Sequence, residues 1–352
     1  MKILIIGPSW IGDMVMAHSL FQSLLHTSPS AELHLMAPPH CKPLAEAMPE
    51  IQKFIPLDIP HGEFNFSKRK NIGHALKQQQ YDQAYILPNS FKSALIPFFA
   101  NIPTRIGYRG EFRYGLLNQI KKINKKKYPL LAHRYWALNI NSNLPTDLPT
   151  DPLNQIPSPR LTLPKTWTTE VHQKFQLCQH KKLAVLCPGA EYGPAKQWPK
   201  THYSELAKTL TQQGYAVWIL GTQKDQSTGD WIKTQSQSQS QANTTLINNL
   251  AGKTSLSEAM VILKQADIVI TNDSGLMHIR AAFDLPQVAL FGSTSEIQTP
   301  PLSQQAQILA LSKNQIPCRP CFERICPKKS PEEHMACLKN IHPQDVLKKI
   351  NI

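Results

Sequence analysis

Asp13 is the first residue of the chain whose type and position could do chemistry. It ends the segment GPSWIGD at 7–13, which follows an apolar run and opens a predicted helix. A carboxylate at the carboxyl end of a strand in an open α/β sheet can act as a general base on an acceptor hydroxyl. The alternative is an acid that the helix dipole favours near an N-terminus, by about 0.3–1 kcal/mol. The segment alone leaves both interpretations open.

The same loop excludes two common nucleotide-binding motifs. A dinucleotide fingerprint needs G-x-G-x-x-G, and Ser9 stands where the close-approach glycine belongs. A P-loop needs Lys and then Ser or Thr after its last glycine, whereas Asp13 and Met14 follow Gly12. A carboxylate in place of that lysine would repel phosphate. The loop therefore argues against an NAD-dependent enzyme and against a nucleoside triphosphate cradle.

A second loop, at 188–199, has the opposite character. Its sequence PGAEYGPAKQWP follows an apolar run and combines small residues with Lys196. Small residues let the backbone approach a ligand closely, and the lysine could neutralise a diphosphate. Lys196 could equally be an ordinary surface lysine in a loop rich in Pro and Gly.

A third loop, at 271–278, also lies at a predicted strand end and starts a helix. Backbone N–H groups near Ser274 and Gly275 would point at an anion, and Asp273 could bind a sugar hydroxyl. His278 lies one turn into that helix, where a buried histidine without a ligand is the commoner outcome. Together with the Lys196 loop, this segment predicts a site for a diphosphate sugar.

Four cysteines near the C-terminus have spacing that resembles a zinc site. They form Cys318-x-x-Cys321-x4-Cys326 with Cys337 further on. The second pair is not a tight C-x-x-C, and packed or redox-sensitive thiols are the alternative.

The elements that position these residues alternate between strands and helices. Predicted strands cover 3–6, 32–36, 85–87, 183–187, 216–220, 267–271 and 288–291, with helices at 13–25, 201–213 and from Ser255 onward. Such alternation predicts α/β domains with parallel sheets. Five prolines at 145–159 place a linker there. The Gln/Ser tract at 235–241 is expected to be a mobile surface loop. We predict domains at 1–165 and 166–340, with a helix at 341–352 that crosses back to the first.

Charge and hydropathy limit the classes of binding partner and the location that we expect for this protein. The chain carries a net charge of +14, and residues 61–140 hold fourteen Lys or Arg against three acids, a net charge of +11. This composition suits nucleic acid, anionic lipid, or a phosphorylated or carboxylated glycan, unless these lysines are simply solvated. The first apolar run is too short for a secretion signal, and no stretch reaches the roughly 18 apolar residues of a membrane span. We expect a cytoplasmic protein with mostly reduced cysteines.

Five segments of the chain together resemble a known family. GPSWIGDMVMA (7–17), MAPPHCKPL (36–44), the long block at 86–118, PGAEYGPAKQWP (188–199) and NDSGLMHIRAA (272–282) are similar to the ADP-heptose:lipopolysaccharide heptosyltransferase II family, in glycosyltransferase family 9. The resemblance implies a GT-B fold, with two Rossmann-like doubly wound domains that face each other across a cleft. It also implies inverting, metal-independent transfer of L-glycero-D-manno-heptose from ADP-heptose to the first heptose of the lipopolysaccharide inner core, with no cofactor required.

The resemblance also implies roles for particular residues. Asp13 would be the base, and Lys196 would stabilise the departing ADP phosphates. The residues expected in the donor pocket are Glu191, Tyr192, Lys196, Thr222, Gln223, Asp273, Ser274, Gly275 and His278. Related enzymes hold the ribose with a Glu near position 223, where this chain has Gln, so Asp225 is the candidate replacement.

The acceptor side follows from the basic first half. Gly12, Arg105, Arg109 and Arg113, with the lysines at 121–127, would hold the carboxylates and phosphates of the Kdo-lipid A core. The same charges would draw the enzyme to the anionic inner face of the inner membrane, with no nucleic acid as partner. The rivals are heptosyltransferase I, another sugar transferase of this architecture, and a non-catalytic polyanion-binding protein. Failure to bind ADP would favour the last.

Overall fold

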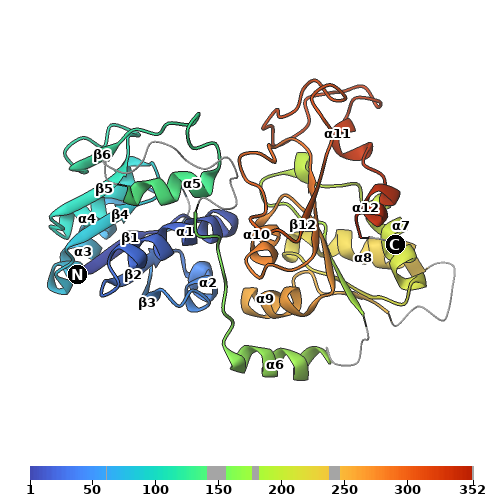
Figure 1. Cartoon of the computed structure of the whole chain (residues 1–352), viewed down its shortest axis with the longest axis horizontal. Helices are drawn as coiled ribbons and strands as arrows, with labels where there is room; N and C mark the ends of the chain where they lie inside the picture. The colour runs from blue at the N-terminus through green and yellow to red at the C-terminus, as the bar shows by residue number, and fades with distance from the viewer. Residues whose placement is uncertain (61, 141–155, 177–181, 238–245, 351–352) are drawn as a thin grey trace. The chain divides into compact units, whose positions relative to one another are not determined.

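The computed structural model describes residues 1–60, 62–140, 156–176, 182–237 and 246–350, and it divides into two compact units (Figure 1). The first unit spans residues 1–162 and the second 163–352. The predicted linker at 145–159 lies mostly outside the described residues. None of the described helices is long and apolar enough to cross a membrane.

The first unit is built on one parallel sheet. Its strand order is β3-β2-β1-β4-β5-β6. The strands are β1 Lys2–Ile6, β2 Glu32–Ala37, β3 Ile51–Pro56, β4 Gln83–Ile86, β5 Thr104–Tyr108 and β6 Gln119–Lys121. The central strands are apolar and almost fully buried, as expected of strands covered on both faces.

Helices connect these strands and pack in pairs. They are α1 Ile11–Thr27, α2 Lys42–Glu46, α3 Phe66–Leu76, α4 Leu95–Phe99 and α5 Leu131–Trp136. Short 3-10 turns are η1 Pro39–Cys41, η2 Lys77–Gln79, η3 Phe91–Ala94 and η4 Ala137–Asn139. Helix α1 packs on α5, and α3 packs on α4, so the sheet lies between two helical layers.

The second unit repeats this architecture. Its strands are β7 Leu183–Cys187, β8 Ala216–Ile219, β9 Ile247–Asn249, β10 Ile268–Asn272, β11 Gln287–Phe291 and β12 Ala306–Ala310, in the order β12-β11-β10-β7-β8-β9. If each unit is numbered from its own first strand, both sheets have the order 3-2-1-4-5-6 of the Rossmann fold. In that fold ligands bind where the strand order reverses, beyond the carboxyl ends of the strands.

The helices of the second unit form two layers as well. They are α6 Lys165–Phe175, α7 Lys200–Gln212, α8 Gln226–Gln237, α9 Leu256–Gln265, α10 Gly275–Ala281, α11 Ala336–Lys339 and α12 Pro343–Lys349, with 3-10 turns η7 Pro194–Lys196 and η8 Gln223–Asp225. Helices α8 and α12 pack on α7, and α6 and α10 pack on α9. Helix α9 follows Ser255, as predicted, and begins with a capping box in which the Ser255 and Glu258 side chains each accept the other's backbone N–H.

One prediction about this unit differs from the structure, and another stays a prediction. The first half of the Gln/Ser tract is the end of α8, where the Ser236 hydroxyl is buried and donates to the Ser204 carbonyl at 3.0 Å. The rest of the tract lies outside the described residues. The C-terminal helix α12 packs on α7 and β12, and Val346 is part of the second unit's core. Its expected return to the first unit stays a prediction.

Candidate functional site

The second unit places two loops at its topological switch point, where β7 and β10 are neighbours. Asn272, the last residue of β10, ties the two loops together. Its Nδ2 donates to the Pro188 carbonyl at 2.7 Å, and its Oδ1 accepts from the Trp198 N–H and the Tyr203 hydroxyl, both at 3.1 Å. Because this side chain is fully buried and bonded on both ends, the loop after β7 is fixed against the end of β10.

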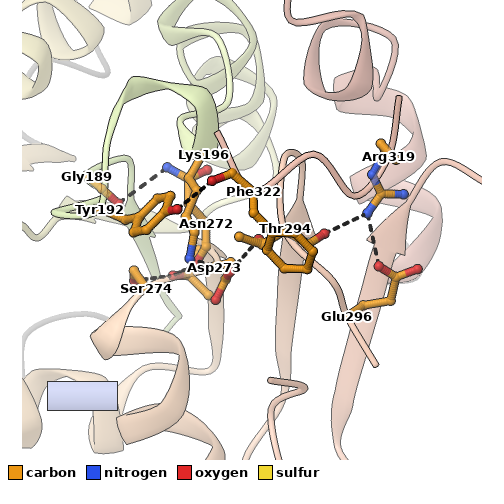
Figure 2. Close-up of polar contacts among 11 residues, drawn as sticks. Gly189, Tyr192, Lys196, Asn272, Asp273, Ser274, Thr294, Glu296, Arg319 and Phe322 are labelled. Atoms are coloured by element: carbon orange, nitrogen blue, oxygen red, sulfur yellow. Dashed lines mark hydrogen bonds and ion pairs between the residues drawn. The ribbon is translucent and has the colours of Figure 1, made fainter. Parts of the chain in front are cut away.

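Lys196 and Asp273 form a close ion pair at this point. The Lys196 Nζ lies 2.6 Å from Asp273 Oδ2, and the two side chains are 13% and 5% exposed. The Thr294 hydroxyl donates to the same carboxylate oxygen at 2.6 Å. The carboxylate is therefore held from two sides, and it positions the ammonium group at the carboxyl end of the sheet (Figure 2).

The Tyr192 ring, in the same loop, has two cations beside it. The Lys196 Nζ lies 4.9 Å from the centroid of its ring, and the Arg324 guanidinium carbon lies 5.1 Å from it. The Tyr192 hydroxyl donates to the Phe322 carbonyl at 2.5 Å. Both cations are within cation–π distance of this ring, which attracts them to it. The arrangement suits an anionic ligand better than a neutral one.

Ser274, Gly275 and His278 lie on or beside the short helix α10. Ser274 is its N-cap, and its hydroxyl lies 3.3 Å from that of Thr271. Burial lowers the pKa of His278 to about 4; the nearby Asp273 charge opposes this shift, and Lys196 adds to it. The imidazole is therefore neutral near pH 7, so it can act as a hydrogen-bonding group but not as a cation.

The remaining predicted donor residues are more exposed. Glu191 forms an ion pair with Lys224, which raises the pKa of that lysine. Thr222 begins the turn before α8, and Asp225 Oδ2 accepts its N–H at 2.8 Å and its hydroxyl at 2.9 Å. Gln223 donates to the Gln226 side chain. The Asp225 carboxylate therefore already accepts two hydrogen bonds within the turn, and a contact with a ribose would have to be made beside them.

In the first unit, Asp13 lies in the first turn of α1, at the carboxyl end of β1. Its side chain is partly buried. After burial itself, the Asp13 charge is the next cause that raises the pKa of Tyr135 on α5. The carboxylate therefore lies close to α5, at this unit's own switch point between β1 and β4. Gly12, one residue earlier, is partly exposed.

The predicted acceptor arginines have three different environments. Arg113 is 2% exposed, and it donates to the Pro88 carbonyl at 2.7 Å and to the Tyr108 carbonyl. Burial lowers its pKa to about 10. Arg105 is half-buried and bonds the carbonyls of Ile102 and Leu116, both at 2.6 Å.

Arg109 is exposed, unlike the other two arginines. Arg105 and Arg113 therefore brace the backbone on both sides of β5 and in the loop after β4. Arg109 is the arginine of this set that a ligand in solvent can reach.

The four C-terminal cysteines line one small cavity together with Ala195 and Arg319. All four are free thiols, and the Met335 N–H donates to the Cys326 sulfur at 3.3 Å. Burial raises the pKa of the Cys337 thiol to about 11, with the Arg319 charge opposing this shift and the other three cysteines adding to it. The residue types suit zinc, but within the described ranges no three Cys, His, Asp or Glu side chains are gathered to hold a metal ion. The zinc site stays a prediction.

Sequence reasoning missed the supports around this site. Thr294 binds Asp273, and Arg319 is 5% exposed, with its guanidinium bonded to the Gly292 carbonyl at 2.7 Å and to Glu296 at 3.0 Å. Figure 2 shows the contacts that run from Asp273 through Thr294 to Arg319 and Glu296. Thr294 follows a buried strand, which is a usable signal. Arg319 gave no signal, because most of its partners are backbone carbonyls distant in sequence.

Two Rossmann-type units, with a carboxylate at the switch point of one and a lysine–carboxylate pair at that of the other, define an α/β protein of the GT-B class. The comparisons agree. The model of glycosyltransferase family 9 (heptosyltransferase) matches residues 69–331. Lipopolysaccharide heptosyltransferase 2 of Escherichia coli (strain K12) is 41% identical over 354 residues, covering 100% of this chain and 98% of that protein.

Two further comparisons agree with this family. Lipooligosaccharide heptosyltransferase 2 of Haemophilus influenzae is 42% identical over 357 residues, covering 100% of this chain and 99% of that protein. The solved structure of E. coli ADP-heptose lps heptosyltransferase II superposes with a TM-score of 0.85 at 40% identity, covering 100% of this chain and 98% of that chain. The chain belongs to glycosyltransferase family 9 and is a glycosyltransferase.

Proposed function

We propose that this enzyme transfers L-glycero-D-manno-heptose from ADP-heptose to the first heptose of the lipopolysaccharide inner core. The names of the relatives support this assignment. The observation that carries it is the Lys196–Asp273–Thr294 arrangement at the switch point of the second unit. We further infer that the reaction takes place in the cytoplasm, at the inner face of the inner membrane, without nucleic acid as a partner.

The donor diphosphate is proposed to bind Lys196 and the backbone N–H groups of Ser274 and Gly275. Asp273, neutral His278, Glu191 and Tyr192 would contact the sugar and the nucleotide, and the turn at Thr222 and Gln223 would contact the ribose. In this proposal the ion pair with Asp273 holds the ammonium in place before the donor arrives. A group that is preorganised in this way loses little reorganisation energy when charge develops on the leaving phosphate.

The reaction is proposed to be a direct displacement that needs no metal. Asp13 takes the proton from the acceptor hydroxyl as its oxygen forms the new bond to the anomeric carbon of the heptose. The bond between that carbon and the ADP oxygen breaks, and ADP leaves with the electron pair. Lys196 and the N–H groups near Ser274 then bind the added negative charge. Inversion at the anomeric carbon is the expected stereochemical result.

The acceptor is proposed to bind the first unit through exposed cations. Arg109 and the exposed lysines at 122, 125 and 126 would bind carboxylates and phosphates of the inner core. Arg105 and Arg113 would shape the loop that presents Arg109, through the carbonyl contacts described above. Gly12 would let the acceptor approach Asp13 closely.

The test is ADP release from ADP-heptose, with and without a lipopolysaccharide acceptor that carries a single heptose. Acceptor-dependent release by the wild type, reduced about 10²–10⁴-fold in kcat by Asp13→Asn with nearly unchanged donor affinity, is the expected result. Binding of ADP-heptose without release would move the assignment to a different acceptor. Failure to bind ADP at all would refute the proposed donor site.

A further inference from the structure

Five phenylalanine rings form a continuous strip on the surface of the first unit. This aromatic strip consists of Phe64, Phe66, Phe91, Phe98 and Phe99, on or beside α3, η3 and α4 (Figure 1). Neighbouring ring centroids are 5.4–6.4 Å apart along the order 91, 64, 66, 99, 98. The side chains of Phe64, Phe66 and Phe98 are 49%, 45% and 38% exposed. Contiguous exposed rings of this kind mark an interaction surface.

The loop after β5 is bonded to the strip at Phe91 and carries two further exposed rings. The Phe91 N–H donates to the Glu111 carboxylate at 2.7 Å, and the next residue, Phe112, is 87% exposed. Tyr114 in the same loop is 61% exposed. Five of the ten large exposed hydrophobic side chains among the described residues therefore lie between positions 64 and 114.

A buried arginine holds the backbone beneath the strip. Arg69 is 5% exposed, and its guanidinium donates to the Phe64 carbonyl at 2.7 Å and to the Glu63 carbonyl at 3.2 Å. A third bond of 3.5 Å reaches the Lys92 carbonyl, beside Phe91. The rings therefore project from a braced backbone.

Cations surround the rings. The Lys70 ammonium lies 5.9 Å from the Phe99 ring centroid, and the Arg105 guanidinium carbon lies 5.6 Å from that of Phe98. Lys77 and Arg109 are exposed nearby in sequence, within the window of net charge +11. Apolar rings with a basic surround match the boundary between acyl chains and anionic headgroups.

The stacking of the rings favours a bilayer over a single-stranded nucleic acid. Phe64 lies between Phe66 and Phe91 at interplanar angles of 12° and 15°, so neighbouring rings stack on it. Nucleic acid bases bind aromatic side chains by stacking on their faces. Membrane insertion requires apolar area in any orientation.

We propose that the aromatic strip, with Phe112 and Tyr114, is the surface by which this enzyme inserts into an anionic lipid bilayer. The strip enters the headgroup layer, and the exposed Lys70, Lys77 and Arg109 contact acidic lipids. This proposal depends on the proposed function only in the second assay below, where a core acceptor is used.

The first test is cosedimentation of the full-length protein with vesicles of phosphatidylglycerol and phosphatidylcholine, and with vesicles of phosphatidylcholine alone. Wild type is expected to bind the anionic vesicles more strongly, and Phe64→Ser/Phe66→Ser to reduce that binding about tenfold or more. Ile297→Ser is the matched control, because Ile297 is 65% exposed in the second unit, and its binding should equal that of the wild type. Thermal unfolding midpoints establish that the variants are folded.

The second test separates membrane docking from catalysis. With a delipidated, water-soluble core acceptor, Phe64→Ser/Phe66→Ser should release ADP at the wild-type rate, whereas with acceptor embedded in vesicles it should be slower. Wild type that does not bind anionic vesicles would overturn the proposal, as would undiminished binding by the double variant. A wild-type dimer that the double variant dissociates, without vesicle binding, would assign the strip to self-association instead. Cosedimentation does not depend on ADP release, so the surface stands or falls separately from the proposed reaction.

Discussion

At the scale of single residues, the charged groups of this enzyme fall into two kinds. Lys196 and Asp273 are paired at the end of the sheet with a small exposed fraction, so a ligand can reach the ammonium. Arg113 is enclosed, and it donates to the Pro88 carbonyl in the loop after β4 and to the Tyr108 carbonyl at the end of β5. We propose that the first kind of charge binds a ligand and that the second stabilises the backbone around it.

Lys196→Met tests the first kind. The substitution keeps much of the side-chain volume but removes the charge that we propose for the leaving phosphate. We expect kcat/KM for ADP-heptose to fall about 10²–10³-fold, measured by ADP release. Lys174→Gln, which removes an exposed lysine paired with Glu258, should change it less than about twofold. Equal effects of the two variants would contradict the role of Lys196.

Arg113→Ala and Arg109→Ala separate the second kind from the first. Removal of the Arg113 guanidinium leaves buried carbonyls without a donor, so the free energy of unfolding should fall by about 2–4 kcal/mol in denaturant titration. Arg109→Ala should leave stability within about 0.5 kcal/mol and raise the KM for the acceptor. A stable Arg113→Ala variant would refute the bracing role.

His278 predicts a pH dependence of stability. Its pKa is about 4 in the folded chain against 6.5 as its ordinary value, so between these pH values the unfolded chain binds the extra proton. This group therefore leaves the free energy of unfolding unchanged above about pH 6.5. As the pH falls from there toward 4, the free energy of unfolding falls by no more than about 1.4 kcal/mol per pH unit. Unfolding midpoints of His278→Gln should fall less than those of the wild type between about pH 7 and pH 5. Parallel curves would refute the assignment.

At the scale of elements, the cysteine-rich segment supports the Lys196 loop. The Arg324 carbonyl accepts the Ala195 N–H at 3.1 Å, and the Phe322 carbonyl accepts the Tyr192 hydroxyl. Arg324 also packs so closely on Gly193, whose φ is 157°, that a side chain at Gly193 would collide with its carbonyl. Binding of a metal or oxidation at the four cysteines would therefore act on the Lys196 loop through these contacts.

Metal analysis tests the state of these cysteines. If the zinc hypothesis holds, protein purified without chelator carries about one zinc per chain, and Cys321→Ser loses it. Cys41→Ser is the control, because Cys41 is buried in the first unit. Metal-free wild-type protein would end the hypothesis and leave packed or redox-sensitive thiols.

The sequence predicts the strands of this fold better than its small elements. Runs such as 183–187 are apolar throughout and coincide with β7, and the loops after β1, β7 and β10 place Asp13, Lys196 and Asp273 where the structure has them. Helices of five or six residues such as α4 and α5 are too short to show periodicity. The burial of Arg113 could not be predicted, because carbonyl partners leave no pattern in the sequence.

At the scale of the whole molecule, the two units have the same strand order, and the match to the family model includes residues of both. Each unit has its proposed site residues at the switch point of its own sheet, where open α/β sheets bind ligands. The membership of glycosyltransferase family 9 therefore agrees with the architecture of both halves.

The parallel sheets have a consequence for how this chain must fold. Every pairing between the described strands is parallel. A parallel pair cannot form from a tight hairpin, because its crossover takes a dozen or more residues. Each pairing therefore closes a loop of chain before it gains a contact, which slows folding and leaves apolar strand edges uncovered in the meantime. Refolding yield should consequently fall as protein concentration rises, even where the finished enzyme is stable.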